Sequence, residues 1–408
     1  MSISYRPLKS LKEGCWFKLI CGASYQHLPV IRNLALVYAL AGADCIDVAA
    51  DPAVVEAVRE AFQVISCFQQ SEALSLPTGI SAPLELPLLM VSFSDGEDPH
   101  FRKATFNVEA CPVDCSRPCE AICPAAAIAF TPSPSGVIAD RCYGCGRCLP
   151  VCPIQHITTT TRATSVAAIA PQILHQVDAI ELHTQVGRYD AFMSLWSAIR
   201  PYLSDLTLIS ISCPDHSQVI DYLWQLYQGI QPLDLPLIWQ TDGRPMSGDI
   251  GKGTTHATIR FAQKVLRSGP PGFVQLAGGT NAHTVVKLRQ LVTSSRDHSL
   301  LLQSPTRRLA EKTKPTFGGI AYGSFARHLM QPLLDDPYPT SSEITSPPQE
   351  TLPTKPYVLN HLEVSPTQLT QAVQTAASLV APLKAVQDIC SMPLLQGIGG
   401  LLPSIESP

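Results

Sequence analysis

The sequence predicts an α/β protein whose strands close into a TIM-like (β/α)8 barrel, with a cysteine-rich, ferredoxin-like segment inserted after the third strand. Strand-like and helix-like segments alternate through most of the 408 residues, and this alternation contains eight strand candidates. Eight of the fourteen cysteines fall between residues 111 and 152 and interrupt the alternation once. An open doubly wound α/β sheet is the alternative that these patterns leave open.

Each strand candidate is a short apolar run, and a segment with apolar residues at helical spacing separates it from the next. The eight strands are expected at residues 15–24, 44–51, 86–94, 179–184, 206–215, 235–243, 272–280 and 317–325. The helices are expected at residues 28–43, 52–62, 166–177, 189–202, 217–230, 254–269 and 281–292. Asp51 is expected to cap the helix that begins at Pro52.

Composition divides the chain into five parts. We expect residues 1–102 and 163–335 to form the barrel, with the insert at residues 103–162. Residues 336–364 are rich in proline, serine and threonine, and predict a linker. Residues 365–408 predict a helix capped by Ser365, followed by a tail. We expect this helix to dock on the barrel or on a partner.

Charge and hydropathy exclude several classes of protein. The net charge of −4 gives no sign of nucleic-acid binding. No run of about 18 apolar residues predicts a membrane span, and the N-terminus lacks the apolar core of a signal peptide. We therefore expect a cytoplasmic protein with no transmembrane segment. Cysteines in that compartment stay reduced, and bind metals or clusters before they form disulfides.

The central cysteines form two groups of four, and each group ends in Cys-Pro. The second group reads C-x2-C-x2-C-x3-C-P, which is the bacterial ferredoxin spacing, whereas the first has one extra residue in each of its first two gaps. In two-cluster ferredoxins the fourth cysteine of each run binds the other cluster. We therefore assign one [4Fe–4S] cluster to Cys111, Cys115, Cys119 and Cys152, and the other to Cys142, Cys145, Cys148 and Cys123.

The flanking segments fit a ferredoxin-like unit. Residues 103–107 and 157–161 can pair as strands, and residues 126–140 predict a hairpin with a Pro/Ser/Gly turn. Paired zinc sites are the alternative for the same cysteines. Zinc favours two separated C-x2-C knuckles around one ion, which the observed spacing does not supply.

Glycines follow two of the late strands, at the end of the barrel where active sites of this fold form. The pairs Gly278-Gly279 and Gly323-Ser324 are expected to form phosphate or anion loops. Tight turns without a ligand are the alternative. The loop that contains Asp242, Arg244, Asp249 and Lys252 does not match a P-loop, and we expect a polar loop over the cleft, with an ordinary surface loop as the alternative.

The remaining titratable side chains receive no catalytic role from the sequence. His183 ends the fourth strand, a position at which a packed histidine is more common than a base. The six other cysteines lack ligand spacing and are expected to be free thiols, with Cys21 and Cys213 at strand ends.

The two cysteine groups, together with "EGCWFKLICGAS" and "QTDGRPMSGDIGKGTTHATIRFAQ", resemble the light-dependent period protein A (LdpA) family of cyanobacteria. The resemblance implies an iron–sulfur protein that feeds the cellular redox state, and hence light intensity, into the circadian clock. It also implies contact with clock input proteins and sensitivity to the quinone pool.

Two functions follow from these features. The first is a dicluster electron-transfer and redox-sensing protein, whose partner is a redox protein or a quinone. The second is a flavin-dependent oxidoreductase in which the clusters supply a flavin in the barrel. The glycine pairs favour the second function, and the lack of a recognisable acid or base disfavours it.

Overall fold

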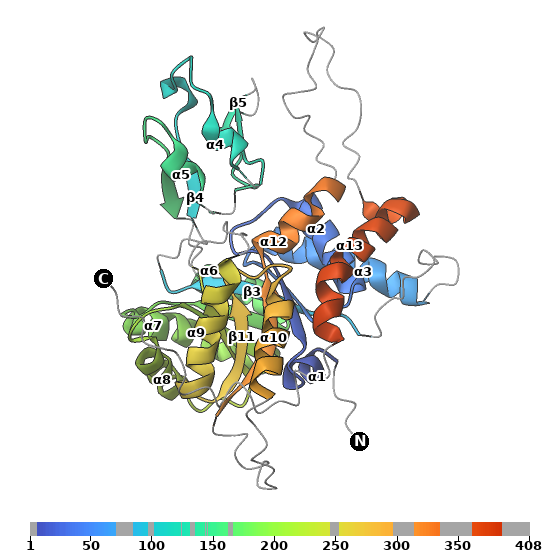
Figure 1. The fold of residues 1–408 in the computed structure, drawn as a ribbon, viewed down its shortest axis with the longest axis vertical. Helices are drawn as coiled ribbons and strands as arrows, with labels where there is room; N and C mark the ends of the chain where they lie inside the picture. Colours follow the sequence, from blue (N-terminus) through green and yellow to red (C-terminus); the bar gives the residue numbers. More distant parts are fainter. Residues whose placement is uncertain are drawn as a thin grey trace.

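The protein contains a closed barrel of eight parallel strands, seen in the computed structural model in Figure 1. The barrel prediction is confirmed, and the open-sheet alternative is wrong. The structure describes residues 6–70, 85–96, 102–123, 125–130, 135–142, 144, 146–161, 166–244, 253–296, 314–334 and 361–385. The strands follow one another in chain order around the barrel: β1 (Trp16–Gly22), β2 (Cys45–Ala49), β3 (Leu88–Ser94), β8 (Ala179–His183), β9 (Leu208–Pro214), β10 (Leu237–Asp242), β11 (Gly272–Ala277) and β12 (Pro315–Tyr322).

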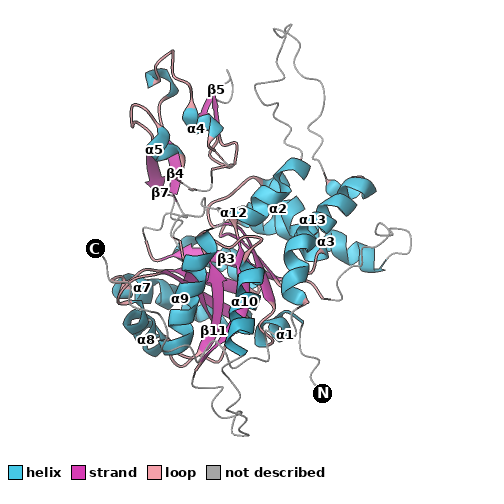
Figure 2. Ribbon diagram, in the orientation of Figure 1, coloured by secondary structure: helices cyan, strands magenta, loops and turns pink. Residues whose placement is uncertain are grey.

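Helices surround the strands on the outside of the barrel (Figure 2). They are α2 (Leu28–Leu40), α3 (Pro52–Gln70), α6 (Val166–Ile173), α7 (Tyr189–Ile199), α8 (Val219–Gly229), α9 (Thr254–Ser268), α10 (Thr284–Arg296) and α12 (Ser324–Met330), with α1 (Arg6–Lys12) ahead of β1. Short 3₁₀ helices are η2 (Val108–Ala110), η3 (Leu174–Gln176), η4 (Arg200–Asp205), η5 (Gln331–Leu333) and η6 (Leu362–Val364). The Asp51 carboxylate accepts the Ala53 N–H at 2.8 Å, so the predicted cap of α3 is confirmed.

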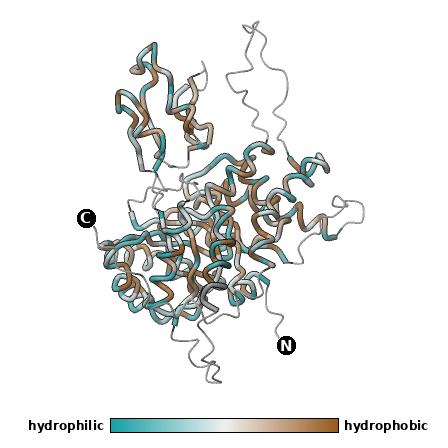
Figure 3. Tube along the Cα trace, in the orientation of Figure 1, coloured by the Kyte–Doolittle hydropathy of each residue, from teal (hydrophilic) through white to brown (hydrophobic). Residues whose placement is uncertain are grey.

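The C-terminal helix α13 (Pro366–Lys384) docks on the barrel, packing beside α2 and α12. Its buried face includes Leu369, Ala376 and Val380, which join the main hydrophobic core. Figure 3 shows hydrophobic residues (brown) interspersed with hydrophilic ones (teal) along the chain, and burial of the hydrophobic ones stabilises the fold. Ser365 occupies the N-cap of α13, but its hydroxyl makes no capping hydrogen bond. The expected boundaries of the five parts of the chain remain predictions.

Replacing Lys384 with methionine should detach the end of α13 from the barrel. The Lys384 ammonium pairs with the Asp44 carboxylate, which is 1% exposed and also accepts the Phe17 N–H at 2.7 Å. Since a buried charge would lose its charged partner, we expect the free energy of unfolding to fall by about 1.5–3 kcal/mol. Urea denaturation of the wild type and of Lys384→Met measures this difference. An effect below about 0.5 kcal/mol would contradict the prediction.

The cysteine-rich insert connects β3 to α6 and stands beside the carboxyl end of the barrel (Figure 1). Its first and last strands, β4 (Arg102–Thr105) and β7 (Thr158–Thr161), pair antiparallel. Between them lie α4 (Pro118–Ala121), the antiparallel hairpin of β5 (Ile128–Phe130) and β6 (Ser135–Val137), and α5 (Cys148–Val151). Both expected strand pairings are therefore present.

The insert is attached to the loop between β1 and α2. The Gln26 N–H donates to the Asp140 carbonyl at 3.0 Å, and the Lys103 ammonium donates to the Gln26 side-chain oxygen at 2.9 Å. The Gln26 amide also donates to the Asp51 carboxylate at 2.7 Å. These contacts hold the insert against the carboxyl end of the barrel. Among the described helices, none is long and apolar enough to cross a membrane.

Candidate iron–sulfur centre

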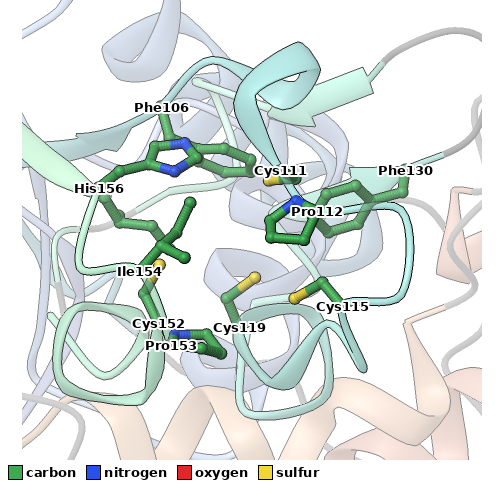
Figure 4. Close-up of a pocket in the computed structure, with 11 residues that line it drawn as sticks. Phe106, Cys111, Pro112, Cys115, Cys119, Phe130, Cys152, Pro153, Ile154 and His156 are labelled. Atoms are coloured by element: carbon green, nitrogen blue, oxygen red, sulfur yellow. The ribbon is translucent and has the colours of Figure 1, made fainter.

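One pocket of the insert gathers four cysteines that are far apart in the sequence. Cys111 and Cys115 lie between η2 and α4, Cys119 is in α4, and Cys152 follows α5. All four line a pocket of about 330 Å³ and their side chains surround a common space (Figure 4). These are the four residues that the sequence predicts as ligands of one cluster.

The rest of this pocket is mostly apolar and aromatic. The Phe106 ring lies 5.8 Å from the Phe130 ring and 5.6 Å from the His156 ring, centroid to centroid. His156 Nε2 lies 3.1 Å from the Asn107 carbonyl oxygen, while Nδ1 is buried and has no hydrogen-bond partner among the described atoms. A pocket with a thiol-bearing lining and a polar atom in need of a partner fits a bound inorganic group.

A second pocket, of about 420 Å³, holds the other predicted set. Cys123, Cys142 and Cys148 line it, together with Gly144 and Gly146. Both glycines have φ = +71°, a left-handed conformation that a side chain at Cβ would strain. The chain between Cys142 and Cys148 can thereby turn tightly around one centre. Cys145, the fourth predicted ligand, lies outside the described residues.

Backbone N–H groups are directed at several of the cysteine sulfurs. The Ala127 N–H donates to Cys123 Sγ at 3.2 Å, and the Ala104 N–H donates to Cys142 Sγ at 3.4 Å. Burial alone would raise the pKa of the Cys152 thiol, but N–H groups of residues 154–157 outweigh it and hold that pKa below its ordinary value. Because metals and clusters bind the thiolate, these donors fit a ligand role for the sulfurs.

At two other cysteines of the insert, the effect of burial on the pKa prevails over that of the N–H donors. Burial raises the pKa of Cys119, against N–H donors of α4, and it raises the pKa of Cys123. Positive charge at the pocket, such as iron, favours the thiolate and would reverse these shifts. Among the described residues, no three Cys, His, Asp or Glu side chains converge on a position for a single metal ion.

Four cysteines outside the insert are free thiols, namely Cys21, Cys45, Cys67 and Cys213, and Cys15 is partly buried. Cys21 and Cys213 are buried at strand ends, and burial raises the pKa of both thiols. Cys45 is also buried, whereas Cys67 is exposed on α3. Cys390 lies outside the described residues.

The two predicted anion loops lie at the carboxyl ends of the adjacent strands β11 and β12. Gly278 and Gly279 have φ of +62° and +108°, and their carbonyls accept hydrogen bonds from Thr258 and Thr254 of α9 at 2.6 and 2.7 Å. A Cβ on Gly278 would lie 2.7 Å from the Arg244 carbonyl oxygen. Close packing thus accounts for glycine there, and anion binding remains a prediction.

At the second loop, Gly323 precedes the short helix α12, and Ser324 is buried. The Ser324 hydroxyl accepts a hydrogen bond from the Arg327 guanidinium at 3.1 Å. The same guanidinium donates to the carbonyls of Ile20 and Cys21 at the end of β1. These contacts tie α12 to the first strand. In the neighbouring polar loop, Asp249 and Lys252 lie outside the described residues.

The barrel interior contains a charged network that the sequence interpretation missed. The fully buried Lys18 ammonium pairs with the Glu181 carboxylate and lies 3.1 Å from Asp47 Oδ2. Glu181 also accepts hydrogen bonds from the Ser210 hydroxyl at 2.8 Å and the Gln240 amide at 2.7 Å. One buried ion pair therefore joins side chains from five strands: β1, β2, β8, β9 and β10.

The network continues toward the carboxyl end of the barrel. His183 Nε2 lies 3.2 Å from Glu181 Oε1, and the Ser212 hydroxyl donates to the Asp242 carboxylate. The Gln240 amide lies 3.3 Å from the same Asp242 carboxylate. The one signal of this network in the sequence is a polar residue in the middle of almost every strand. Within any one strand, this polar residue looks like a single exception in an apolar run, so the sequence does not show that these residues contact one another.

The pH dependence of stability should change when Asp47 becomes asparagine. Burial raises the pKa of Asp47 to about 6, with the Lys18 charge opposing and the Glu181 charge adding to the shift. The unfolded value is about 4, so the folded state holds this proton more tightly and loses that advantage as pH rises through about 6. Wild-type stability should fall relative to Asp47→Asn between about pH 4 and pH 6, and the difference should be constant above that range in urea titrations. A constant difference between the two proteins within that range would contradict the prediction.

Known proteins match both the insert and the barrel. The model of the LdpA Fe-S cluster-binding domain matches residues 111–163, and that of the Light dependent period A C-terminal domain matches residues 173–382. Light dependent period A of Synechococcus elongatus (strain ATCC 33912 / PCC 7942 / FACHB-805) is 48% identical over 408 residues, which cover 100% of this chain and 98% of the relative. No solved structure matches the chain. The chain therefore is an iron–sulfur protein, and it belongs to the Light dependent period A family.

Proposed function

We propose that the protein holds two [4Fe–4S] clusters in a ferredoxin-like insert and uses them to sense the cellular redox state. One cluster is bound by Cys111, Cys115, Cys119 and Cys152, and the other by Cys142, Cys145, Cys148 and Cys123. When bound, such clusters take up and release single electrons.

The observation that carries this proposal is the sorting of the cysteines into two pockets. Every described member of the first set lines one pocket, and every described member of the second set lines the other. In each pocket, one cysteine comes from the opposite group in the sequence, as in two-cluster ferredoxins. Backbone N–H groups directed at the sulfurs support the same proposal, because such donors stabilise thiolates and tune the potentials of clusters.

The biological setting follows from the relative. Its name associates it with a light-dependent period, and we propose that the present chain reports redox state, as a measure of light, to the circadian clock. The partners would be a redox protein or a quinone and proteins of the clock input. A reducing compartment, the cytoplasm, suits cysteines that serve as cluster ligands.

The experiment is an analysis of anaerobically purified protein. Iron, acid-labile sulfide, zinc and flavin are measured together, and the visible and electron paramagnetic resonance spectra are followed through a redox titration. We expect about eight irons and eight sulfides per chain, with reversible reduction. Zinc without sulfide would support the zinc alternative, and stoichiometric flavin with turnover of a small acceptor would support the flavin enzyme. Clusters that cannot be cycled reversibly would reject redox sensing.

The first cluster should be more sensitive to air than the second. Cys111 and Cys115 are partly exposed, and Val113 between them is fully exposed, whereas Cys142 and Cys148 are buried. Oxygen should therefore reach the first pocket more readily. Electron paramagnetic resonance during an air titration should show the signal of the first cluster changing earlier. Earlier loss of the second cluster would overturn this prediction.

A further inference from the structure

Arg117 has a backbone conformation that arginine rarely adopts. It lies between the second and third cysteines of the first group, just before α4, with φ = +51° and ψ = +50°. In this left-handed region the side chain crowds the backbone, so the conformation costs free energy at most residues other than glycine. Between the second and third cysteines of the second group, the left-handed residue is a glycine, Gly146. An arginine at such a position indicates that its side chain has a role.

The Arg117 side chain is held at the aromatic wall of the first pocket. Its guanidinium carbon lies 4.5 Å from the centroid of the Phe130 ring, which is the geometry of a cation–π contact. Phe130 lines the pocket together with the four cysteines of the first set (Figure 4), and its ring packs against Phe106. A positive charge is therefore fixed beside the proposed cluster.

This charge acts on a pocket whose described lining has no Lys, Arg, Asp or Glu. Burial raises the pKa of the Cys111 thiol, and Cys115 and Cys152 add to the shift, whereas the Arg117 charge opposes it. A cation that stabilises a thiolate in this pocket also stabilises any further negative charge placed there.

We propose that Arg117 raises the reduction potential of the first cluster, and that Phe130 holds its guanidinium in position. This inference rests on the proposed function, because it requires a cluster in the first pocket. Reduction transfers one electron to a cluster from a one-electron carrier, and no bond of the protein forms or breaks. The nearby positive charge stabilises the added negative charge, so Arg117 favours the reduced state. The potential at which the first cluster responds to the cell would then depend on this arginine.

The test is a redox titration of the anaerobically purified full chain, with dithionite as the reductant and electron paramagnetic resonance as the readout. Arg117→Asn removes the charge, and asparagine tolerates a left-handed backbone. Since Arg117 is exposed and solvent screens its charge, we expect a moderate effect. The midpoint potential of the first cluster should fall by about 30–60 mV, a threefold to tenfold change in the ratio of reduced to oxidised cluster.

The second cluster should keep its potential in this variant, because its cysteines line a separate pocket. Arg117→Lys retains the positive charge, and should shift the potential of the first cluster by less than about half as much. The first cluster is identified as the one whose signal is lost in Cys119→Ser, since Cys119 lines the first pocket.

Phe130→Leu tests how the guanidinium is held. Leucine keeps the wall apolar but lacks the aromatic face against which Arg117 lies. In this background, Arg117→Asn should lower the potential by at most about half of its effect in the wild type. Any direct effect of leucine on the cluster cancels, because the comparison is made with the same residue at position 130. Equal shifts in the two backgrounds would refute the role of Phe130.

The control is Arg59→Asn, which removes the same charge from a side chain that is 44% exposed on α3, outside the insert. Both potentials should stay unchanged. The proposal fails if Arg117→Asn changes the ratio by less than about 1.5-fold, or if Arg59→Asn produces the same shift. If Arg117→Asn binds no iron, Arg117→Gly decides in its place, because glycine suits the left-handed backbone. A wild type without iron and sulfide would instead reject the proposed function, and this inference with it.

Discussion

Serine at Cys119 should remove about half of the iron and acid-labile sulfide, because one of the two proposed clusters then lacks a ligand. Cys119 lines the pocket of the first set, and the second set occupies a separate pocket. The loss should therefore fall on one electron paramagnetic resonance signal. Anaerobic purification followed by iron and sulfide analysis measures the loss, and the spectrum of the reduced protein shows which signal remains.

The reciprocal variant is Cys148→Ser, which lies in the second pocket and should remove the other signal. Serine at Cys67, an exposed cysteine on α3, serves as the control and should leave the iron content unchanged. Loss of the same signal in both pocket variants would refute the assignment of the two sets. Stoichiometric zinc in the wild type would refute it as well.

Methionine at Lys18 should strongly destabilise the barrel. The ammonium is fully buried between the carboxylates of Asp47 and Glu181. Its removal leaves two carboxylates in the interior without their counter-charge. Breaking a buried ion pair in this way costs about 3–5 kcal/mol, which is a large fraction of the stability of a domain. Urea denaturation followed by tryptophan fluorescence reports on the barrel through the buried Trp16 and Trp239.

The matched control for that change is Lys9→Met. Lys9 is 61% exposed and faces Glu13 at 3.8 Å, one helical turn away. An exposed pair of this kind contributes about 0.3–0.5 kcal/mol, so the control should differ little from the wild type. A cost below about 1 kcal/mol for Lys18→Met would mean that the interior charges rearrange or take up water.

The barrel and the two cysteine sets could be predicted because each leaves a local pattern in the sequence. The alternation of apolar strands and helices indicates a barrel, and Cys142, Cys145, Cys148 and Cys152 have the spacing of a ferredoxin run, whose last cysteine serves the other cluster. The charged network leaves no such pattern. Lys18 and Glu181 are 163 positions apart, and only closure of the barrel places them in contact. Ser365 is a second example. The sequence correctly predicts that it precedes α13, but its hydroxyl does not make the capping hydrogen bond.

The antiparallel pairing of β4 and β7 brings the first and last strands of the insert together where it joins the barrel. The chain leaves the barrel after β3 and returns to it at α6 through two paired strands, Arg102 opposite Thr161 and Thr105 opposite Thr158. Because the paired strands hold the two ends together, the barrel need only bridge a short gap, and the insertion adds little loop entropy to its folding. Cutting the chain at this junction would break no strand pairing of the barrel, and it would remove the contacts of Gln26 with Asp140 and Lys103. The cluster-bearing unit should therefore be transplantable, either alone or into the same loop of another barrel.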